Sequence, residues 1–291
     1  MTNPPFRSEV LKDRICVVTG GGSGICFGVT LELLRSGCKG AVICGRRESF
    51  LQKACRILSQ KTGKTVLYCV CDVRKPEMCE DVVNYTREKF GRLDILINGA
   101  AGNFLARADQ ISPKGFATVM AIDTLGTFNM CSAAYSLLKE SPSGIIINIS
   151  ATLHYGATWW QAHASAAKSA VDSLTRSLAL EWGSDGIRVN GIAPGPIADT
   201  PGTTKLAPGL NESHVKNMME EGIPLGRMGE AREIGETAVF LSVSEYITGH
   251  TVVVDGGEWM YRKPLVPAEL VAELSRKVEK TSRSQVPRAN L

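Results

Sequence analysis

The sequence predicts an α/β fold in which a doubly wound parallel sheet carries helices on both faces. Short, nearly continuous apolar runs alternate with segments of helical periodicity as far as about residue 257. This alternation is typical of a parallel sheet that is covered on both sides. Glycine or polar residues follow the apolar runs, and ligands of such sheets bind where the strands end.

Seven apolar runs are the predicted strands. In chain order they cover residues 15–18, 42–44, 65–71, 93–97, 144–149, 187–190 and 251–254. The helical segments between them cover 25–36, 50–60, 76–90, 116–139, 162–182 and 230–241. Acidic residues open the helix at 76, as the helix dipole prefers, and Gly37 is a stop signal for the first helix.

Length and composition fit an ordinary globular protein. The chain has 291 residues, of which 44% are hydrophobic and 21% charged. We expect an N-terminal arm (1–12), one α/β domain (13–261) and a polar tail (262–291) with a short helix at 267–280. The net charge of +4 gives no nucleic-acid footprint. No stretch is apolar enough for a membrane span, and residues 1–8 do not resemble a signal peptide.

Nine cysteines lie in the first half of the chain. Their number is odd and no C-x-x-C pair occurs, which argues against a disulfide framework and against a zinc site. We therefore expect buried thiols in a reducing compartment and no bound metal.

A glycine-rich turn is the most informative stretch. Residues 19–26 read T-G-G-G-S-G-I-C, directly after the first strand and at the start of the first helix. Backbone N–H groups at such a turn and the positive end of the helix suit a dinucleotide pyrophosphate. Glycines also mark ordinary loops, and Cys26 stands where a third glycine is expected.

Two arginines at the end of the second strand favour NADP(H) over NAD(H). NAD enzymes usually place an acid there for the ribose 2′-hydroxyl, whereas Arg46 and Arg47 suit a 2′-phosphate. A solvated arginine pair is the alternative. Asp72 follows the third strand, where a carboxylate can accept an N–H group from adenine.

Five motifs at their spacings resemble the short-chain dehydrogenase/reductase superfamily over about residues 12–260. They are 19–24, 98–102, Lys168, Pro194-Gly195 and 255–257. The resemblance implies a Rossmann-type sheet of seven strands and a tetramer, or a dimer, built on the two long helices. The cofactor contacts predicted on this basis are Gly20, Gly21, Gly22, Ser23, Gly24, Ile25, Arg46, Arg47, Asp72, Val73, Asn98, Ala100, Lys168, Pro194, Gly195, Pro196, Ile197 and Thr200.

Three catalytic positions of that superfamily are changed. Ala164 stands where the proton-transferring Tyr is expected, Ala151 replaces the Ser after the fifth strand, and Asp123 replaces an Asn. Lys168, which in the superfamily holds the nicotinamide ribose, is present. A routine alcohol or ketone oxidoreductase is therefore not expected.

Segments 100–104, 122–129, 163–165 and 193–197 resemble the peroxisomal 2,4-dienoyl-CoA reductases. That family reduces a 2,4-dienoyl-CoA to a 3-enoyl-CoA with NADPH, and the proton goes to a carbon atom rather than to an alcohol oxygen. The resemblance implies catalysis by Asp123 and Lys168 and substrate contacts at Arg46, Arg74, Phe104 and Lys205. Tyr155, in the loop after the fifth strand, is a rival proton donor.

Two other functions remain open at this stage. One is a trans-2-enoyl-CoA reductase, although Asp123 and Lys168 favour the dienoyl branch; the other is a non-catalytic NADPH-binding protein. The chain ends Ala289-Asn290-Leu291, a degenerate form of the Ser-Lys-Leu peroxisomal address. We therefore expect recognition by the peroxisomal import receptor, with the cytoplasm as the alternative location.

Overall fold

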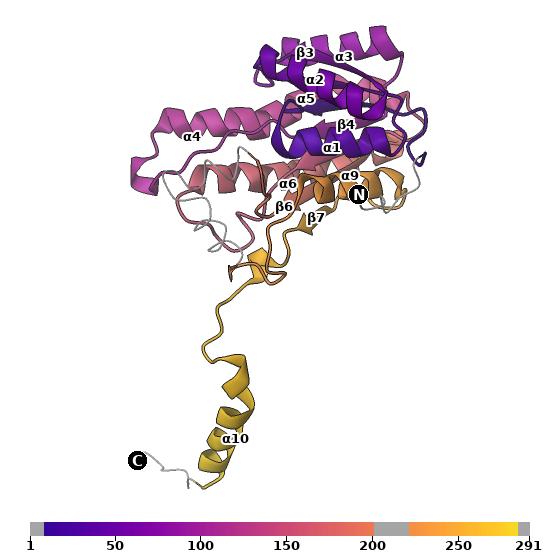
Figure 1. Ribbon diagram of the computed structural model, residues 1–291. Helices are drawn as coiled ribbons and strands as arrows, with labels where there is room; N and C mark the ends of the chain where they lie inside the picture. Colours follow the sequence, from indigo (N-terminus) through magenta and orange to yellow (C-terminus); the bar gives the residue numbers. More distant parts are fainter. Residues whose placement is uncertain (1–8, 201–220, 285–291) are drawn as a thin grey trace. The chain divides into compact units, whose positions relative to one another are not determined.

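The computed structural model describes residues 9–200 and 221–284 (Figure 1). The chain divides into two units, Met1–Trp259 and Met260–Leu291, which are described separately below.

The first unit is built on a seven-stranded sheet in which every neighbouring pair of strands is parallel. Its strands are β1 (Ile15–Thr19), β2 (Gly40–Gly45), β3 (Thr65–Val70), β4 (Ile95–Asn98), β5 (Ile145–Ile149), β6 (Arg188–Pro194) and β7 (Thr251–Val254). The order is β3-β2-β1-β4-β5-β6-β7, so the direction of winding reverses between β1 and β4. The predicted doubly wound α/β fold is confirmed, and the reversal marks where a ligand is expected.

Helices α1 (Gly24–Arg35), α2 (Glu48–Thr62) and α9 (Ala231–Val243) cover one face of the sheet. They pack on alternate strand residues, for example Val18 and Ile43. Figure 1 shows α1 and α9 side by side. A Cβ atom on Gly28 would lie 2.6 Å from the Cβ of Ala231, so the close approach of these two helices requires glycine.

Helices α3 (Pro76–Phe90), α5 (Gly126–Lys139) and α6 (Ala162–Trp182) cover the other face. Their apolar sides meet the strand residues that point the opposite way, such as Val17, Leu96 and Ile146. The nine cysteines all carry free thiols, and all are buried except the half-buried Cys69. The prediction of buried thiols is therefore confirmed.

The predicted helix over 116–139 differs from the structure in two ways. It begins earlier, as α4 (Pro113–Met120), because the Ser112 side chain accepts a hydrogen bond from the N–H of Gly115 and caps it. It is then interrupted by a π-helical turn, η2 (Ala121–Leu125), before α5 begins at Gly126. Such turns occur frequently at functional sites, and this one contains Asp123.

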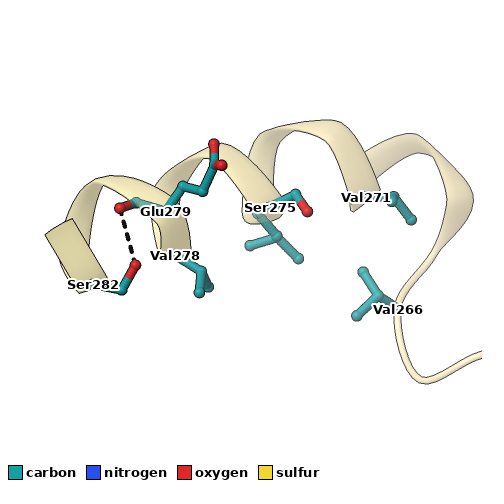
Figure 2. A pocket seen from close by; sticks show the side chains of 7 residues that line it. Val266, Val271, Ser275, Val278, Glu279 and Ser282 are labelled. Atoms are coloured by element: carbon teal, nitrogen blue, oxygen red, sulfur yellow. Dashed lines mark hydrogen bonds between the residues drawn. The ribbon is translucent and has the colours of Figure 1, made fainter.

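The second unit contains α10 (Ala268–Ser284), which confirms the helix predicted in the tail. Val266, Val271, Leu274 and Val278 supply the apolar part of a groove along it, which Ser275, Glu279 and Ser282 also line (Figure 2). Short 3₁₀ turns complete the described chain: η1 (Ala108–Gln110), η3 (Gly183–Asp185) and η4 (Glu258–Met260). Within the described ranges, no helix is long and apolar enough to cross a membrane, and no acidic, His or Cys cluster could hold a metal.

Candidate active site

The glycine turn at 20–24 joins β1 to α1 and is shaped by steric limits. Gly20 has φ +72°, and a Cβ atom on it would meet the carbonyl oxygen of Gly99 at 3.0 Å. A Cβ on Gly21 would lie 2.7 Å from Cγ2 of Ile43. Ser23 precedes α1 without using its side chain as a cap, so it leaves the first-turn N–H groups to other partners. The turn therefore has the narrow backbone surface and the helix dipole that bind a pyrophosphate.

Cys26 fills the space between α1 and the end of β4. A Cβ atom on Gly99 would lie only 2.0 Å from the Cys26 Sγ atom, so the thiol packs directly on the Gly99 backbone. Burial raises the pKa of Cys26 to about 12, which keeps the thiol neutral. Cys26, which stands in place of the expected glycine, therefore serves to pack α1 against the backbone of Gly99.

The backbone after β4 is tied to β1 where the winding reverses. The hydroxyl Oγ1 of Thr19 accepts hydrogen bonds from the N–H groups of Gly99 and Ala100, at 2.9 and 3.0 Å. Asn98, at the end of β4, donates from Nδ2 to the Asn148 side-chain oxygen at 2.9 Å. These buried bonds fix the start of the segment that leads to Phe104.

Charged side chains lie at the ends of β2 and β3. Arg46 and Arg47 are exposed, and the Arg47 guanidinium sits 3.8 Å from the centre of the Phe50 ring. The Nε atom of Arg74 donates to Asp72 at 2.9 Å. This bond, with a smaller contribution from Arg46, lowers the pKa of Asp72. Arg46 and Arg74 thus both act on the Asp72 carboxylate at the ends of β2 and β3.

Asp123 and Lys168 form a buried ion pair. Asp123 is 1% exposed; its Oδ1 accepts the Gly102 N–H at 2.6 Å and its Oδ2 lies 3.2 Å from the Lys168 Nζ. Lys168 also donates to the carbonyl oxygen of Ile149, at the end of β5, at 2.9 Å. The pair therefore connects the π turn, α6 and the ends of β4 and β5.

Two threonine hydroxyl groups bond to the backbone around Asp123 and in α6. Thr127 Oγ1 donates to the backbone oxygen of Asp123 at 2.6 Å, and Thr124 Oγ1 donates to the backbone oxygen of Ala167, in α6, at 3.3 Å. Ala164 is 2% exposed and packs in a small apolar cluster with Val119 and Ala167. The position of the usual Tyr is thus filled by packing, and no hydroxyl group projects from it.

Tyr155 bonds to Asp172 and not to the Asp123–Lys168 pair. Its hydroxyl donates to Oδ2 of Asp172, at 3.4 Å, and His154 Nε2 lies 2.8 Å from the same oxygen. Burial, with Asp172 adding to it, raises the pKa of Tyr155 to about 12. In this structure Tyr155 therefore belongs to a separate hydrogen-bonded cluster and is a poor proton donor at neutral pH.

The segment after β6 follows a close backbone approach. A Cβ on Gly195 would lie 2.6 Å from the Cβ of Asp255, and the Gly195 N–H donates to the oxygen of Val254 at 3.0 Å. Ile197 and Thr200 are buried. Lys205, a predicted substrate contact, lies outside the described residues.

His163 is a site residue that sequence reasoning assigned no role. It lies in the first turn of α6, directly before Ala164, and is completely buried. The Phe104 ring covers it, with the ring centroids 4.1 Å apart. The only available signal was a histidine adjacent to the position where a catalytic Tyr is missing.

The chain is similar to known reductases over most of its length. The family model described as enoyl-(acyl carrier protein) reductase matches residues 20–258. Proteins named peroxisomal 2,4-dienoyl-CoA reductase [(3E)-enoyl-CoA-producing] are 48% identical in Arabidopsis thaliana (97% of this chain, 96% of the relative) and 43% identical in Danio rerio (88% and 84%). A Bacillus anthracis short chain dehydrogenase structure matches with a TM-score of 0.77 and 35% identity, over 87% of this chain and all of that one.

Proposed function

Because this chain belongs to the short-chain dehydrogenase/reductase family, we propose that it reduces 2,4-dienoyl-CoA to 3-enoyl-CoA with NADPH during the β-oxidation of unsaturated fatty acids. It is an oxidoreductase that uses a nicotinamide cofactor, and its relatives from a plant, a fish, mammals and yeast carry the name of this activity. The single observation that carries the proposal beyond these names is the buried Asp123–Lys168 pair beside Ala164.

The residues at the glycine turn fit a dinucleotide. Gly20 and Gly21 leave no room for a Cβ atom, so the turn can hold its tight main-chain course, and α1 directs its positive end at the turn. Arg46 and Arg47, exposed at the end of β2, support a 2′-phosphate and hence NADPH. We propose further cofactor contacts at Asp72, Val73, Asn98 and Ala100, and a contact of Lys168 with the nicotinamide ribose. When bound, the cofactor supplies a hydride to the δ-carbon of the diene.

The protein's own groups manage the negative charge and the proton. As the dienolate forms, charge spreads to the thioester oxygen, where hydrogen-bond donors of the protein must stabilise it. Asp123 holds Lys168 and orders the water that gives a proton to the α-carbon; the hydroxide left behind takes a proton from bulk water. No hydroxyl acid is required at position 164, because no alcohol oxygen is protonated. This is the chemical reason that a buried alanine is compatible with turnover.

Substrate contacts are proposed for Arg46, Arg74, Phe104 and Lys205. Arg46 and Arg74 lie at neighbouring strand ends, where cationic groups suit the phosphates of coenzyme A. Phe104 is 39% exposed and supplies an apolar surface for the acyl chain.

One assay separates this function from its alternatives. We expect purified protein to oxidise NADPH with 2,4-decadienoyl-CoA and to release a 3-enoyl-CoA. Activity on 2-enoyl-CoA alone would identify a trans-2-enoyl-CoA reductase. Binding of NADPH without turnover of either thioester would identify a non-catalytic NADPH-binding protein.

We propose a homo-tetramer, or a dimer, that forms through α5 and α6. Large apolar side chains are exposed along these helices and the π turn: Leu125 is 48%, Phe128 43% and Leu180 85% exposed. Light scattering of the purified protein tests this, and a monomer at micromolar concentration would contradict it.

We propose a peroxisomal location. Relatives from plant, fish and yeast are named peroxisomal. The terminal tripeptide Ala289-Asn290-Leu291 lies outside the described residues and is the proposed signal for the import receptor. Deleting it should leave the protein in the cytosol, and unchanged import would show that the tripeptide is not the signal.

A further inference from the structure

His163 is a buried polar side chain without hydrogen bonds to the described protein. It is 0% exposed, and neither Nδ1 nor Nε2 has a hydrogen-bond partner among the described residues. The backbone of Phe104 lies close enough to favour the protonated ring, but it completes no hydrogen bond. Almost all buried polar groups in native proteins are paired, so this exception requires an explanation.

Folding alone does not explain an imidazole at this position. Burying an unpaired donor and acceptor costs free energy that a leucine of similar volume would not cost. Burial lowers the pKa of His163, whereas the Asp123 carboxylate acts in the opposite direction, so the ring is neutral at neutral pH. The histidine therefore contributes no charge to the folded protein, and its hydrogen-bonding groups are unused.

The unused groups lie beside the reacting centre. His163 is one residue from Ala164, and the charge of Asp123 acts to raise the pKa of its ring. A second unpaired atom is the buried Oδ1 of Asn103, the residue before Phe104. Asn103 donates from Nδ2 to Gln161, the residue that precedes α6. Unpaired polar atoms thus occur both beside Phe104 and at the start of α6.

Phe104 separates His163 from solvent. Its ring stacks on the imidazole at 4.1 Å with a tilt of 33°, and it remains 39% exposed. Residues 99–107 form no helix or strand, and the tip of the Phe104 ring lies against Gly115 of α4. A shift of the ring would open the face of the imidazole that it covers.

We propose that His163 is a further catalytic residue, whose ring N–H donates a hydrogen bond to the thioester oxygen once the substrate displaces Phe104. The proposal rests on the dienoyl reduction proposed above. It assigns a role to a side chain that neither the glycine turn nor the Asp123–Lys168 pair explains.

The chemistry of the dienolate calls for such a donor. Negative charge builds on the thioester oxygen, and the Lys168 ammonium group is already paired with the Asp123 carboxylate. A neutral imidazole N–H stabilises an enolate oxygen without adding a proton that the oxygen could retain. The proton then goes to the α-carbon, as a 3-enoyl product requires.

The decisive experiment compares His163→Leu with His163→Gln in the full chain. We expect His163→Leu to lower kcat with dienoyl-CoA on the order of 10²-fold, the usual effect of losing one oxyanion donor. We also expect it to raise the Tm of the free protein by roughly 2–4 °C, because the unpaired polar groups are gone. His163→Gln retains a neutral donor and should recover part of kcat. His250→Leu, at an exposed histidine, is the matched control for both measurements.

Each outcome decides the proposal. A His163→Leu protein with lower Tm would show that the ring is already paired in the free protein, by an internal water for example, and that its role is structural. Unchanged kcat in His163→Leu would also overturn the proposal. A wild-type protein that does not reduce dienoyl-CoA would instead refute the proposed function, while a rise of Tm in His163→Leu would still confirm the unpaired state.

Discussion

The two sides of the candidate site are built in different ways. On the cofactor side, at the ends of β1 and β2, the surface is mostly main chain, because four of the five residues at 20–24 are glycines. On the reacting side, the π turn and α6 supply buried side chains whose charges and hydrogen bonds depend on one another. A surface made of backbone serves many reactions, whereas the side-chain cluster determines which reaction occurs.

The largest expected effect lies on the reacting side. Asp123→Ala should reduce kcat with dienoyl-CoA by about 10²–10⁴-fold, because the water that protonates the α-carbon loses its anchor and Lys168 its partner. NADPH affinity, measured by fluorescence, should change little, because the glycine turn is untouched. The two sides are independent only if both results hold.

Asp123→Asn and Asp109→Ala are the controls. Asp123→Asn keeps the acceptor for the Gly102 N–H and therefore the fold of segment 99–102, while it removes the charge opposite Lys168. Asp109 is an exposed carboxylate paired with Arg107, and its loss should not affect kcat. Full activity in Asp123→Asn would show that the charge of the pair is not needed.

The next effect lies on the cofactor side. Replacing both Arg46 and Arg47 by Ala should lower kcat/KM for NADPH by roughly 10–100-fold and leave the value for NADH nearly unchanged. Charge-assisted hydrogen bonds to a phosphate contribute about 1.5–3 kcal/mol each. Parallel losses with the two cofactors would indicate a general binding defect and contradict the assignment of a 2′-phosphate site.

The single variants Arg46→Ala and Arg47→Ala should have different effects on cofactor and substrate binding. Arg47 packs over Phe50, whereas Arg46 influences Asp72. Arg56→Ala, at an exposed position of α2, controls for loss of surface charge. Because the proposed roles overlap, Arg46→Ala should also raise KM for the acyl-CoA, and Arg47→Ala should not.

This difference between the sides determines what the sequence can predict. The strands and helices of the first unit follow from apolar runs and glycine stops, and the turn at 20–24 follows from sterics that only glycine satisfies. The π turn was missed, because the apolar residues around Asp123 continue a helical period and a single inserted residue leaves no separate signal. The lack of partners for His163 depends on packing of Phe104 across the chain, which no local pattern records.

The two sides of the site meet where Gly99, after β4, packs against Cys26 of α1. Gly99→Ala would place a Cβ atom 2.0 Å from the Cys26 Sγ atom, and we expect it to lower the free energy of unfolding by about 1–3 kcal/mol. Cys26→Gly should make room for that methyl group. The double variant Cys26→Gly/Gly99→Ala should therefore be more stable than the sum of the single changes predicts.

Denaturant unfolding of the four proteins measures the coupling. A coupling of about 1 kcal/mol or more identifies Cys26 as the packing partner of Gly99. Additive effects would mean that α1 moves away from β4 and absorbs the methyl group. The Kd for NADPH in Cys26→Gly should stay within about threefold of wild type, because the thiol belongs to the packing of the turn. A threefold change in Kd corresponds to about 0.6 kcal/mol of binding free energy.

The smallest expected effect concerns the edge of the reacting side. Tyr155→Phe should leave kcat within about threefold of wild type, because the Tyr155 hydroxyl bonds to Asp172 and not to the Asp123–Lys168 pair. The lost hydrogen bond is long, at 3.4 Å, so unfolding should become easier by no more than about 1 kcal/mol. Tyr135→Phe, which removes a hydroxyl bonded to Asp185, is the matched control. A large loss of kcat in Tyr155→Phe alone would place the loop after β5 within the proton-transfer machinery, and the water ordered by Asp123 would then no longer suffice as the proton source.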